Sequence, residues 1–215
     1  MDFPEWERFY SEIRKDFGFK REQDEVVAAE LDSLLGGQRI EDAALRTLLR
    51  GKEVTVAGNG PNVGDEIGAA RGVLVTADEA TSEALEKGLR PAVLVTDLDG
   101  DVAVQVAANA DGTIAVVHGH GDNGPAVRQW APKFVGRTLA TTQSMPTGRL
   151  RNFGGFTDGD RAVFLADHFG AARIHLVGFD FENPNAKDRD RHTKQRKLDW
   201  AYILLGSLER DDLEL

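Results

Sequence analysis

Short runs of apolar residues alternate with helical patterns from residue 51 to the end of the chain. The apolar runs lack polar alternation, which is typical of parallel strands buried on both faces. They predict strands at 53–57, 72–76, 92–95, 114–117, 138–142 and 173–177. Helices are predicted between them, at 63–70, 79–87, 101–109, 125–133 and 159–169, with a last one over 193–208. This alternation predicts an α/β fold with right-handed βαβ units and a mostly parallel sheet.

The first 50 residues carry a helical pattern instead. Phe9, Ile13 and Phe17 recur at four-residue spacing and predict a first helix. A second helix, which ends before two glycines, has an apolar face made of Val26, Val27, Leu31, Leu34 and Leu35. A third, short helix is predicted over 40–49. We therefore divide the chain into an N-terminal helical segment, 1–50, and an α/β catalytic domain, 51–215. The segment is expected to serve packing, and contacts between copies if the protein forms a homo-oligomer.

The charge balance argues against a nucleic-acid partner. The chain has 26 lysines and arginines against 36 aspartates and glutamates, a formal net charge of -10, whereas phosphate neutralisation needs a basic face. It contains no cysteine, which excludes disulfides, thiolate metal sites and cysteine nucleophiles. The first residues lack a signal pattern, and no stretch reaches the roughly 18 apolar residues of a membrane helix. These features predict a cytoplasmic protein that does not enter a membrane.

Acidic side chains follow two neighbouring predicted strands. Asp97 and Asp99 come after the strand at 92–95, and Asp122 comes after the strand at 114–117. Because the carboxyl ends of parallel strands meet at one edge of the sheet, these carboxylates are expected to converge there and to need a cation. Mg²⁺ is typically held by such carboxylates together with substrate phosphates. The Asp-x-Asp-Gly string is also typical of ordinary turns, and of phosphatases in which Asp97 would be the nucleophile and Asp99 the acid.

Two histidines precede Asp122, in the string from His118 to Asn123. The string matches the His-x-His-x-Asp-His pattern of zinc hydrolases up to its last residue, where Asn123 departs from it. Three interpretations of His118 and His120 therefore stay open: zinc ligands, contacts to substrate or phosphate, and caps of the strand end.

A glycine-rich turn from Gly58 to Asn62 follows the first predicted strand of the domain and opens a helix. Such a turn lets backbone N–H groups approach a phosphate, which makes Asn59, Gly60 and Asn62 candidate phosphate-binding residues. A nicotinamide site is the alternative, because Asp78 lies 20 residues after Gly58. The third glycine of the turn falls one residue late for that fingerprint.

Two further segments hold candidate ligand contacts. The loop 152–160 combines paired glycines with flanking aromatic residues, which indicates an approach to a flat ring. Its Asp158 lies at a predicted helix start, where the helix dipole alone also favours a carboxylate. The segment 187–197 is either a solvated face or a source of cations for phosphates. Its basic residues are Lys187, Arg189, Arg191, Lys194, Arg196 and Lys197.

Five strings of residues, in this order, carry a resemblance to a known family. They are Gly-Asn-Gly-Pro-Asn, Thr-Asp-Leu-Asp-Gly, His-Gly-His-Gly-Asp-Asn, Asn-Phe-Gly-Gly-Phe-Thr-Asp-Gly-Asp-Arg and Lys-Gln-Arg-Lys-Leu. Over residues 52–205 the chain resembles the archaeal 6-hydroxymethyl-7,8-dihydropterin pyrophosphokinases, relatives of thiamin pyrophosphokinase. The resemblance implies a Rossmann-like catalytic domain similar to that of thiamin pyrophosphokinase. It also implies transfer of diphosphate from ATP to a reduced pterin, with release of AMP, in the pathway to folate or methanopterin.

The resemblance and the site pattern together assign roles. The predicted catalytic residues are Asp97, Asp99 and Asp122, and with Asp158 they would hold Mg²⁺, directly or through water. The predicted ATP and phosphate contacts are Asn59, Gly60, Asn62, Lys194, Arg196 and Lys197. The predicted contacts to the pterin or the adenine are Asn123, Asn152, Phe153, Gly154, Gly155 and Phe156.

Besides the phosphatase with Asp97 as nucleophile, two alternatives to this function stay open at the sequence level. Thiamin pyrophosphokinase normally has a Gly-Asp-Phe-Asp-Ser loop and a second, all-β domain, whereas here the loop is Thr-Asp-Leu-Asp-Gly and we expect no such domain after Leu208. A non-catalytic nucleotide-binding domain is the alternative of a different class. Turnover of ATP with Mg²⁺, rather than binding alone, would distinguish it.

Overall fold

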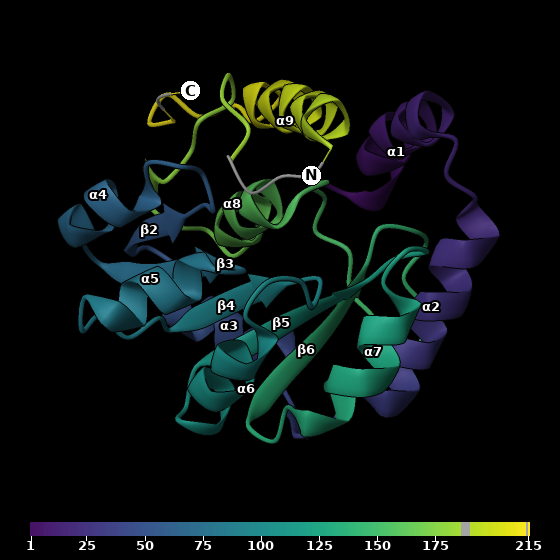
Figure 1. The fold of residues 1–215 in the computed structure, drawn as a ribbon, viewed down its shortest axis with the longest axis horizontal. Helices are drawn as coiled ribbons and strands as arrows, with labels where there is room; N and C mark the ends of the chain where they lie inside the picture. Colours follow the sequence, from purple (N-terminus) through teal and green to yellow (C-terminus); the bar gives the residue numbers. More distant parts are fainter. Residues whose placement is uncertain (186–189, 214) are drawn as a thin grey trace.

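Seven parallel strands form one sheet in the computed structural model, which describes residues 1–185, 190–213 and 215 (Figure 1). The strands are β1 (Gln38–Arg39), β2 (Glu53–Ala57), β3 (Val73–Ala77), β4 (Val93–Thr96), β5 (Ile114–Gly119), β6 (Arg137–Thr142) and β7 (Arg173–Val177). Their order along the sheet is β1-β6-β5-β4-β3-β2-β7. The sheet therefore grows in one direction from β2 to β6 and then returns to place β7 on the other side of β2. Such a switch point is where open α/β sheets bind ligands.

The six predicted strands are confirmed, each within two residues of its predicted bounds. Strand β1 is not predicted, because two residues are too few to show a periodicity. It pairs with the edge of β6 and joins the N-terminal segment to the sheet of the α/β domain.

The helices are α1 (Phe3–Phe17), α2 (Arg21–Leu34), α3 (Asp42–Leu49), α4 (Val63–Glu66), α5 (Ala80–Glu86), α6 (Val102–Ala110), α7 (Gly124–Trp130), α8 (Asp158–His168) and α9 (Arg191–Gly206). The predicted helices at 63–70 and 125–133 each end early and continue as a 3₁₀ turn, at Ile67–Ala69 and Ala131–Lys133. Gly68 is a poor helix former and Pro132 has no N–H to donate, which accounts for both changes. No helix in the described parts of the chain is both long and apolar enough to cross a membrane.

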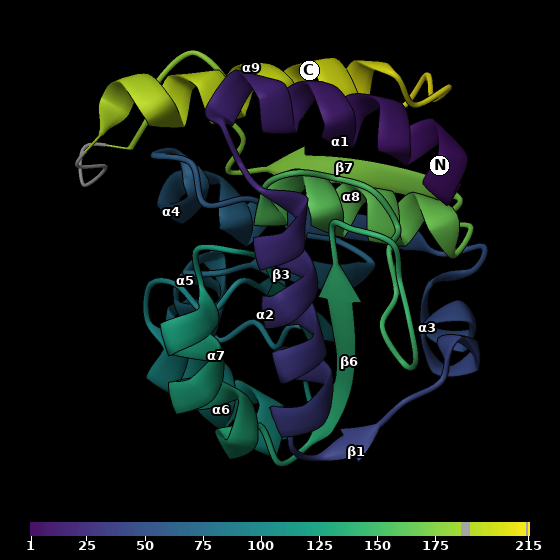
Figure 2. The same ribbon diagram turned by 90° about the vertical axis from the view of Figure 1, so that its right-hand side faces the viewer.

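Both faces of the sheet are covered by helices. Helices α1, α3, α8 and α9 share one hydrophobic core with the sheet, and α2, α4, α5, α6 and α7 pack on the opposite face (Figures 1 and 2). Successive strand residues alternate between the two faces, so Val93 and Val95 face the first group and Leu94 faces the second. In Figure 2, α1 and α9 run side by side above α8, while α2 descends beside α7.

The N-terminal helices present faces that differ in part from the predicted ones. The residues that α1 buries are Trp6, Tyr10 and Ile13, whereas Phe9 and Phe17 are only partly buried. On α2, Val27 is buried but Val26 is 67% exposed. Neighbouring helix positions point about 100° apart, so only one of these two valines can face the sheet. The prediction that Val26 belongs to the apolar face is therefore wrong.

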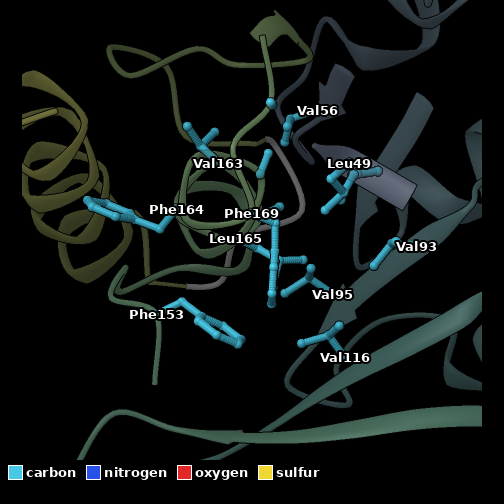
Figure 3. Close-up of a cluster of buried hydrophobic side chains, with 14 of the residues drawn as sticks. Leu49, Val56, Val93, Val95, Val116, Phe153, Val163, Phe164, Leu165 and Phe169 are labelled. Atoms are coloured by element: carbon cyan, nitrogen blue, oxygen red, sulfur yellow. The ribbon is translucent and has the colours of Figure 1, made fainter. Parts of the chain in front are cut away.

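Helix α8 fills the core above the centre of the sheet. In Figure 3, Leu165 and Phe169 lie on the side of α8 that faces Val95 and Val116, whereas Phe164 points to the opposite side. All five side chains are at most 2% exposed. The start of the same helix carries Asp158, so this packing also fixes the position of a predicted site residue.

Leu165→Ala is expected to lower the free energy of unfolding by about 2–5 kcal/mol, because it leaves a cavity in this core. Urea denaturation would measure the change. Val26→Ala is the control, with an expected change below about 0.5 kcal/mol, since the side chain is exposed. Equal effects of the two substitutions would contradict the described packing of α8.

Candidate active site

A cavity opens at the carboxyl edge of the sheet, where six neighbouring strands end. In spatial order from β6 to β7, the residues that follow the strands and line the cavity are Gln143, His120, Asp97, Asp78, Gly58 and Gly178. Helix α9 covers the cavity with Lys194 and Lys197, α8 contributes Asp158, and the connection from α1 to α2 contributes Phe19. The predicted convergence of site residues at this edge is therefore confirmed.

Three carboxylates in the cavity form an acidic cluster, Asp78, Asp97 and Asp158. One oxygen of each lies within 4.8 Å of the other two. Oδ1 of Asp78 and Oδ1 of Asp97 are buried and have no hydrogen-bond partner. Carboxylates this close repel one another, and burying them without partners is costly. The cluster fits a hard cation such as Mg²⁺, whose preferred ligands are carboxylate oxygens.

The three carboxylates differ in their readiness to ionise. Burial, then the charges of Asp158 and Asp97, raises the pKa of Asp78 well above its ordinary value. Burial and the charge of Asp97 also raise the pKa of Asp158. Burial opposes ionisation of Asp97 too, but the hydrogen bond from His120 and the nearby charges of Arg161 and Lys197 act against burial, and the pKa of Asp97 is lowered. Asp97 is therefore the carboxylate best prepared to receive a cation, and a bound cation would lower the pKa of the other two.

An unusual backbone conformation marks the loops that carry this cluster. Among the described residues, Asp78 and Leu98 are the two non-glycine residues with positive φ, at 45° and 69°. A leucine rarely adopts this region, so the turn after Asp97 must be held by its surroundings. The Thr96 hydroxyl accepts a hydrogen bond from the Leu98 N–H at 2.8 Å and donates one to Gln105 at 2.7 Å. The strained turn therefore directs Asp97 into the cavity while Leu98 stays buried.

The two histidines of the β5 loop have different surroundings. His120 Nδ1 accepts a hydrogen bond from the Asp122 N–H, so its Nε2 carries the proton and donates to Asp97 Oδ2 at 3.3 Å. His118 is 2% exposed, and its Nδ1 contacts the Thr141 hydroxyl at 3.0 Å. Burial, followed by the charge of Arg161, lowers the pKa of His118 well below its ordinary value. Within the described residues, no histidine belongs to a group close enough to share one ion, which gives the zinc interpretation no support.

Asp99 and Asp122 line the cavity but stand apart from the cluster. Both side chains are exposed, and Asp99 accepts a hydrogen bond from the Gly100 N–H at 2.8 Å. The sequence pattern groups them with Asp97 as Mg²⁺ ligands, whereas the structure groups Asp97 with Asp78 and Asp158. The turn is the physical reason: Asp97 and Asp99 would share a face if the strand continued, but β4 ends at Thr96 and Leu98 between them has a φ of 69°, so the two carboxylates have different surroundings.

A buried arginine balances part of the negative charge. Arg161 on α8 is 7% exposed and lines the cavity. Its Nη1 donates to Asp158 Oδ1 at 3.1 Å, and its Nη2 donates to Gln143 Oε1 at 3.3 Å. Its Nε is buried without a partner. Arg161 is the last residue of the fourth string that carries the family resemblance, but the sequence pattern assigns it no role, and Gln143 belongs to none of the five strings.

Two of the three predicted phosphate-binding cations line the cavity, Lys194 and Lys197. Arg196 does not. Its guanidinium pairs with Asp16 at 2.7 Å and lies over the ring of Phe17, 4.4 Å from the ring centre. Successive residues of a helix cannot all face one side, so α9 turns Arg196 toward α1. The predicted cations Lys187 and Arg189 lie outside the described residues.

The glycine-rich turn packs directly against the loop after β7. The Gly60 N–H donates to the Gly178 carbonyl at 2.7 Å, and a Cβ at Gly58 would lie 2.7 Å from the same oxygen. Close backbone approach therefore requires glycine at 58, independently of any phosphate. Of the three residues predicted to contact phosphate, Asn59 and Gly60 line the cavity, whereas the amide of Asn62 donates to Glu66 and to a backbone carbonyl.

Asn123 ties the two acidic loops together. Its Nδ2 donates to the carbonyls of Asp97, at 2.6 Å, and His118, at 2.9 Å, while its Oδ1 accepts from the His120 N–H. The side chain is buried and is not among the residues that line the cavity. Its predicted contact to a pterin or an adenine is replaced by these backbone contacts.

Asn123→Ala is expected to lower the free energy of unfolding by about 2–4 kcal/mol, because it leaves buried backbone groups without partners. Thermal or urea unfolding would measure the loss. Asn62→Ala is the matched control, an asparagine in the glycine-rich turn after β2 whose removal should change stability by less than about 1 kcal/mol. A neutral Asn123→Ala would show that its amide does not hold the loops.

Among the predicted ring-binding residues of the segment 152–156, Phe156 alone lines the cavity. Asn152 bonds the Ser144 carbonyl and the Gly154 N–H, and the ring of Phe153 packs edge-on against Phe169 of the core. A Cβ at Gly155, where φ is 88°, would lie 2.6 Å from the Cα of Arg161. Close packing on α8 therefore explains the glycine.

Aromatic rings line the cavity from two sides. Phe19 and Phe156 form one pair, with ring centres 6.5 Å apart, and Phe179 and Phe181 form the other, 5.9 Å apart. The sequence pattern points to Phe156 but misses the other three, because they lie in connections far apart in the chain.

Comparisons with known proteins relate the chain to one family. A profile of the family described as 6-hydroxymethylpterin diphosphokinase MptE-like matches residues 31–186. Three relatives are named 6-hydroxymethyl-7,8-dihydropterin pyrophosphokinase. The one from Methanothermobacter thermautotrophicus is 39% identical over 98% of this chain and 97% of its own length. The one from Methanocaldococcus jannaschii is 34% identical over 100% and 98%, and the one from Pyrococcus furiosus is 37% identical over 98% and 96%.

A solved structure, the MAf glycosyltransferase from Magnetospirillum magneticum AMB-1, is also similar to part of the fold. Its TM-score is 0.48 at 19% identity, and the match covers 80% of this chain and 29% of that one.

Proposed function

The chain belongs to the MptE-like 6-hydroxymethylpterin diphosphokinase family, and from this membership we propose that it transfers diphosphate from ATP to 6-hydroxymethyl-7,8-dihydropterin. The hydroxymethyl oxygen attacks the β-phosphorus of ATP, the bond between this phosphorus and the α,β-bridging oxygen breaks, and AMP leaves with the electron pair. Asp122, the exposed carboxylate beside His120 in the cavity, accepts the proton of the attacking hydroxyl group in this proposal. The reaction belongs to the pathway to folate or methanopterin.

The observation that carries the proposal is the acidic cluster at the centre of the cavity. Asp78, Asp97 and Asp158 would hold Mg²⁺, and Asp99 would reach it through water. The ion would neutralise charge on the transferring diphosphate. His120 keeps Asp97 ionised and oriented by donating Nε2–H to it. Phosphoryl-type transfer requires mainly that the protein positions the reactants and stabilises the charge of the transition state, and this arrangement supplies both.

Cations and rings around the cluster support binding of the two substrates. Lys194 and Lys197 reach the cavity from α9 and would bond ATP phosphates, as would the backbone at Asn59 and Gly60. The reaction joins two substrates that each carry a flat ring, and the cavity has two aromatic pairs. We assign the adenine to Phe179 and Phe181, beside the glycine-rich turn at the switch point of the sheet, and the pterin to the pair of Phe19 and Phe156.

The test is a product assay. The purified protein is incubated with ATP, Mg²⁺ and 6-hydroxymethyl-7,8-dihydropterin, with thiamin in a parallel reaction, and the products are separated by chromatography. We expect AMP and the diphosphorylated pterin, with no product from thiamin. Free phosphate with an aspartyl-phosphate on Asp97 would contradict the proposal and indicate a phosphatase. Binding of ATP without turnover would indicate a non-catalytic nucleotide-binding domain. A homo-oligomer and a cytoplasmic location stay predictions.

A further inference from the structure

A buried carboxylate of the N-terminal segment lies between the site loops. Asp24 on α2 is 2% exposed and accepts three hydrogen bonds. Its Oδ1 accepts from the Gly121 N–H at 2.7 Å, in the loop that carries His120. Its Oδ2 accepts from the Tyr10 hydroxyl at 2.6 Å and from Gln143 Nε2 at 2.9 Å. A carboxylate has no proton to donate, so all three bonds have a fixed direction.

Gln143 connects Asp24 to the catalytic cavity, because its amide bonds Asp24 with one end and Arg161 with the other. Its backbone carbonyl accepts the indole N–H of Trp6 at 2.7 Å, so α1 fixes its main chain. Its Nε2 points to Asp24, and its Oε1 must therefore point the other way, where it accepts from Arg161 at 3.3 Å. Arg161 in turn bonds Asp158 of the acidic cluster.

We infer that Asp24 is a positioning residue for the catalytic site: it sets the orientation of the Gln143 amide, and through that amide it holds Arg161 beside Asp158. The kinetic part of this inference rests on the proposed diphosphate transfer. The structural part does not, because the orientation of Arg161 can be observed without substrate. In this account the N-terminal helices form part of the active site's support and are not only a cover of the sheet.

Replacing the Asp24 carboxylate with an amide is expected to reverse the orientation of the Gln143 side-chain amide. In Asp24→Asn the new oxygen can keep the Gly121 N–H, but the new NH₂ then faces Gln143 Nε2, and two donors cannot bond. The Gln143 amide must turn its oxygen toward position 24. Its NH₂ then faces Nη2 of Arg161, so an attractive contact becomes a repulsive one. Arg161 loses its second anchor although neither it nor Asp158 has been changed.

The first readout is the Arg161 Nε–H, which is buried in the wild-type protein and can be followed by hydrogen exchange in NMR. We expect its protection to fall by about tenfold or more in Asp24→Asn, because Arg161 opens more often. The second readout is kinetic. We expect kcat to fall by about 10- to 100-fold, the usual loss when a group that orients a site residue is removed, while KM for ATP changes by less than about threefold.

Two further variants separate positioning from stability. Asp24→Asn combined with Gln143→Glu restores an acceptor toward Arg161 and keeps the total charge, so both readouts are expected to return toward wild type. Tyr10→Phe is the control, because it removes one bond to Asp24 without touching Gln143. It should lower Tm but leave kcat and the Arg161 signal unchanged. If Asp24→Asn does not fold, Gln143→Leu removes the bond between Gln143 and Arg161 directly. It should lower both the protection of the Arg161 Nε–H and kcat, as expected for Asp24→Asn.

The inference is overturned if folded Asp24→Asn keeps both its kcat and its Arg161 protection, or if the double variant recovers neither. If the wild-type protein shows no pterin turnover, the proposed function fails, but the exchange of the Arg161 Nε–H still decides whether Asp24 positions this side chain.

Discussion

Asp97→Asn and Asp78→Asn are each expected to lower kcat by about 10²- to 10³-fold, the loss typical when one group that stabilises transition-state charge is removed. Each substitution takes one charge from the acidic cluster, whose oxygens lie within 4.8 Å of one another. Steady-state assays of AMP formation at saturating Mg²⁺ would measure the loss.

Asp99→Asn is the matched control, because Asp99 lies one residue beyond Leu98 in the same turn but outside the cluster. Its effect on kcat is expected to be at least about tenfold smaller, since an exposed carboxylate would act through water. A larger loss from Asp99→Asn than from Asp78→Asn would contradict the assignment of the cation to the cluster.

Asp78→Asn should also raise Tm in metal-free buffer at pH 7. Burial and the neighbouring carboxylates raise the pKa of Asp78 in the folded state, so keeping it ionised at neutral pH weakens folding. This penalty disappears as the pH falls and the carboxyl group becomes protonated, and the gain in Tm should shrink accordingly. A lower Tm of the variant at pH 7 would show that Asp78 is stabilised as an anion without a metal ion.

Lys194→Ala combined with Lys197→Ala is expected to raise KM for ATP by about 100-fold or more, because each of the two charge-assisted phosphate bonds contributes roughly 1.5–3 kcal/mol. Both lysines line the cavity on the side opposite the strand ends. KM for the pterin should change much less. Initial rates at varied ATP and at varied pterin would separate the two effects.

Arg196→Ala is the control for this pair. It removes a cation from the same turn of α9, but that cation contacts Asp16 and the ring of Phe17 rather than the cavity. We expect lower stability with nearly unchanged KM for ATP. If Arg196→Ala weakens ATP as much as the double lysine variant does, the cavity side of α9 is not what holds the phosphates.

The sequence alone predicts most of the fold because buried parallel strands leave a strong local signal. The apolar residues of Val93–Thr96, for example, predict a strand from the local sequence alone, whichever strands it pairs with. Strand β1, at Gln38–Arg39, leaves no such signal, since its two residues are placed by pairing with β6. The face of α2 could not be assigned between Val26 and Val27, because both are apolar and only packing distinguishes them.

The site is predicted less completely, because motifs reveal which residue types are present but not which way they point. Asp78 follows a strand as Asp97 does, yet it stands alone in the sequence and its role depends on the neighbouring strand. The sequence pattern predicts that Asn123 contacts a ligand, but its amide donates hydrogen bonds to backbone carbonyls of two loops. Arg161 and Gln143 meet only because the first turn of α8 lies at the strand ends. Contacts of this kind arise only in the tertiary structure and leave no periodic pattern in the sequence.

The central claim is that one cation binds among Asp78, Asp97 and Asp158. The most direct measurement is a crystal of the wild-type protein soaked with Mn²⁺ and a non-hydrolysable ATP analogue, with data collected for the anomalous signal of manganese. The account predicts an anomalous peak in contact with carboxylate oxygens of this cluster and with the phosphates of the analogue. A peak held by Asp99 and Asp122, with none among the three clustered carboxylates, would contradict it.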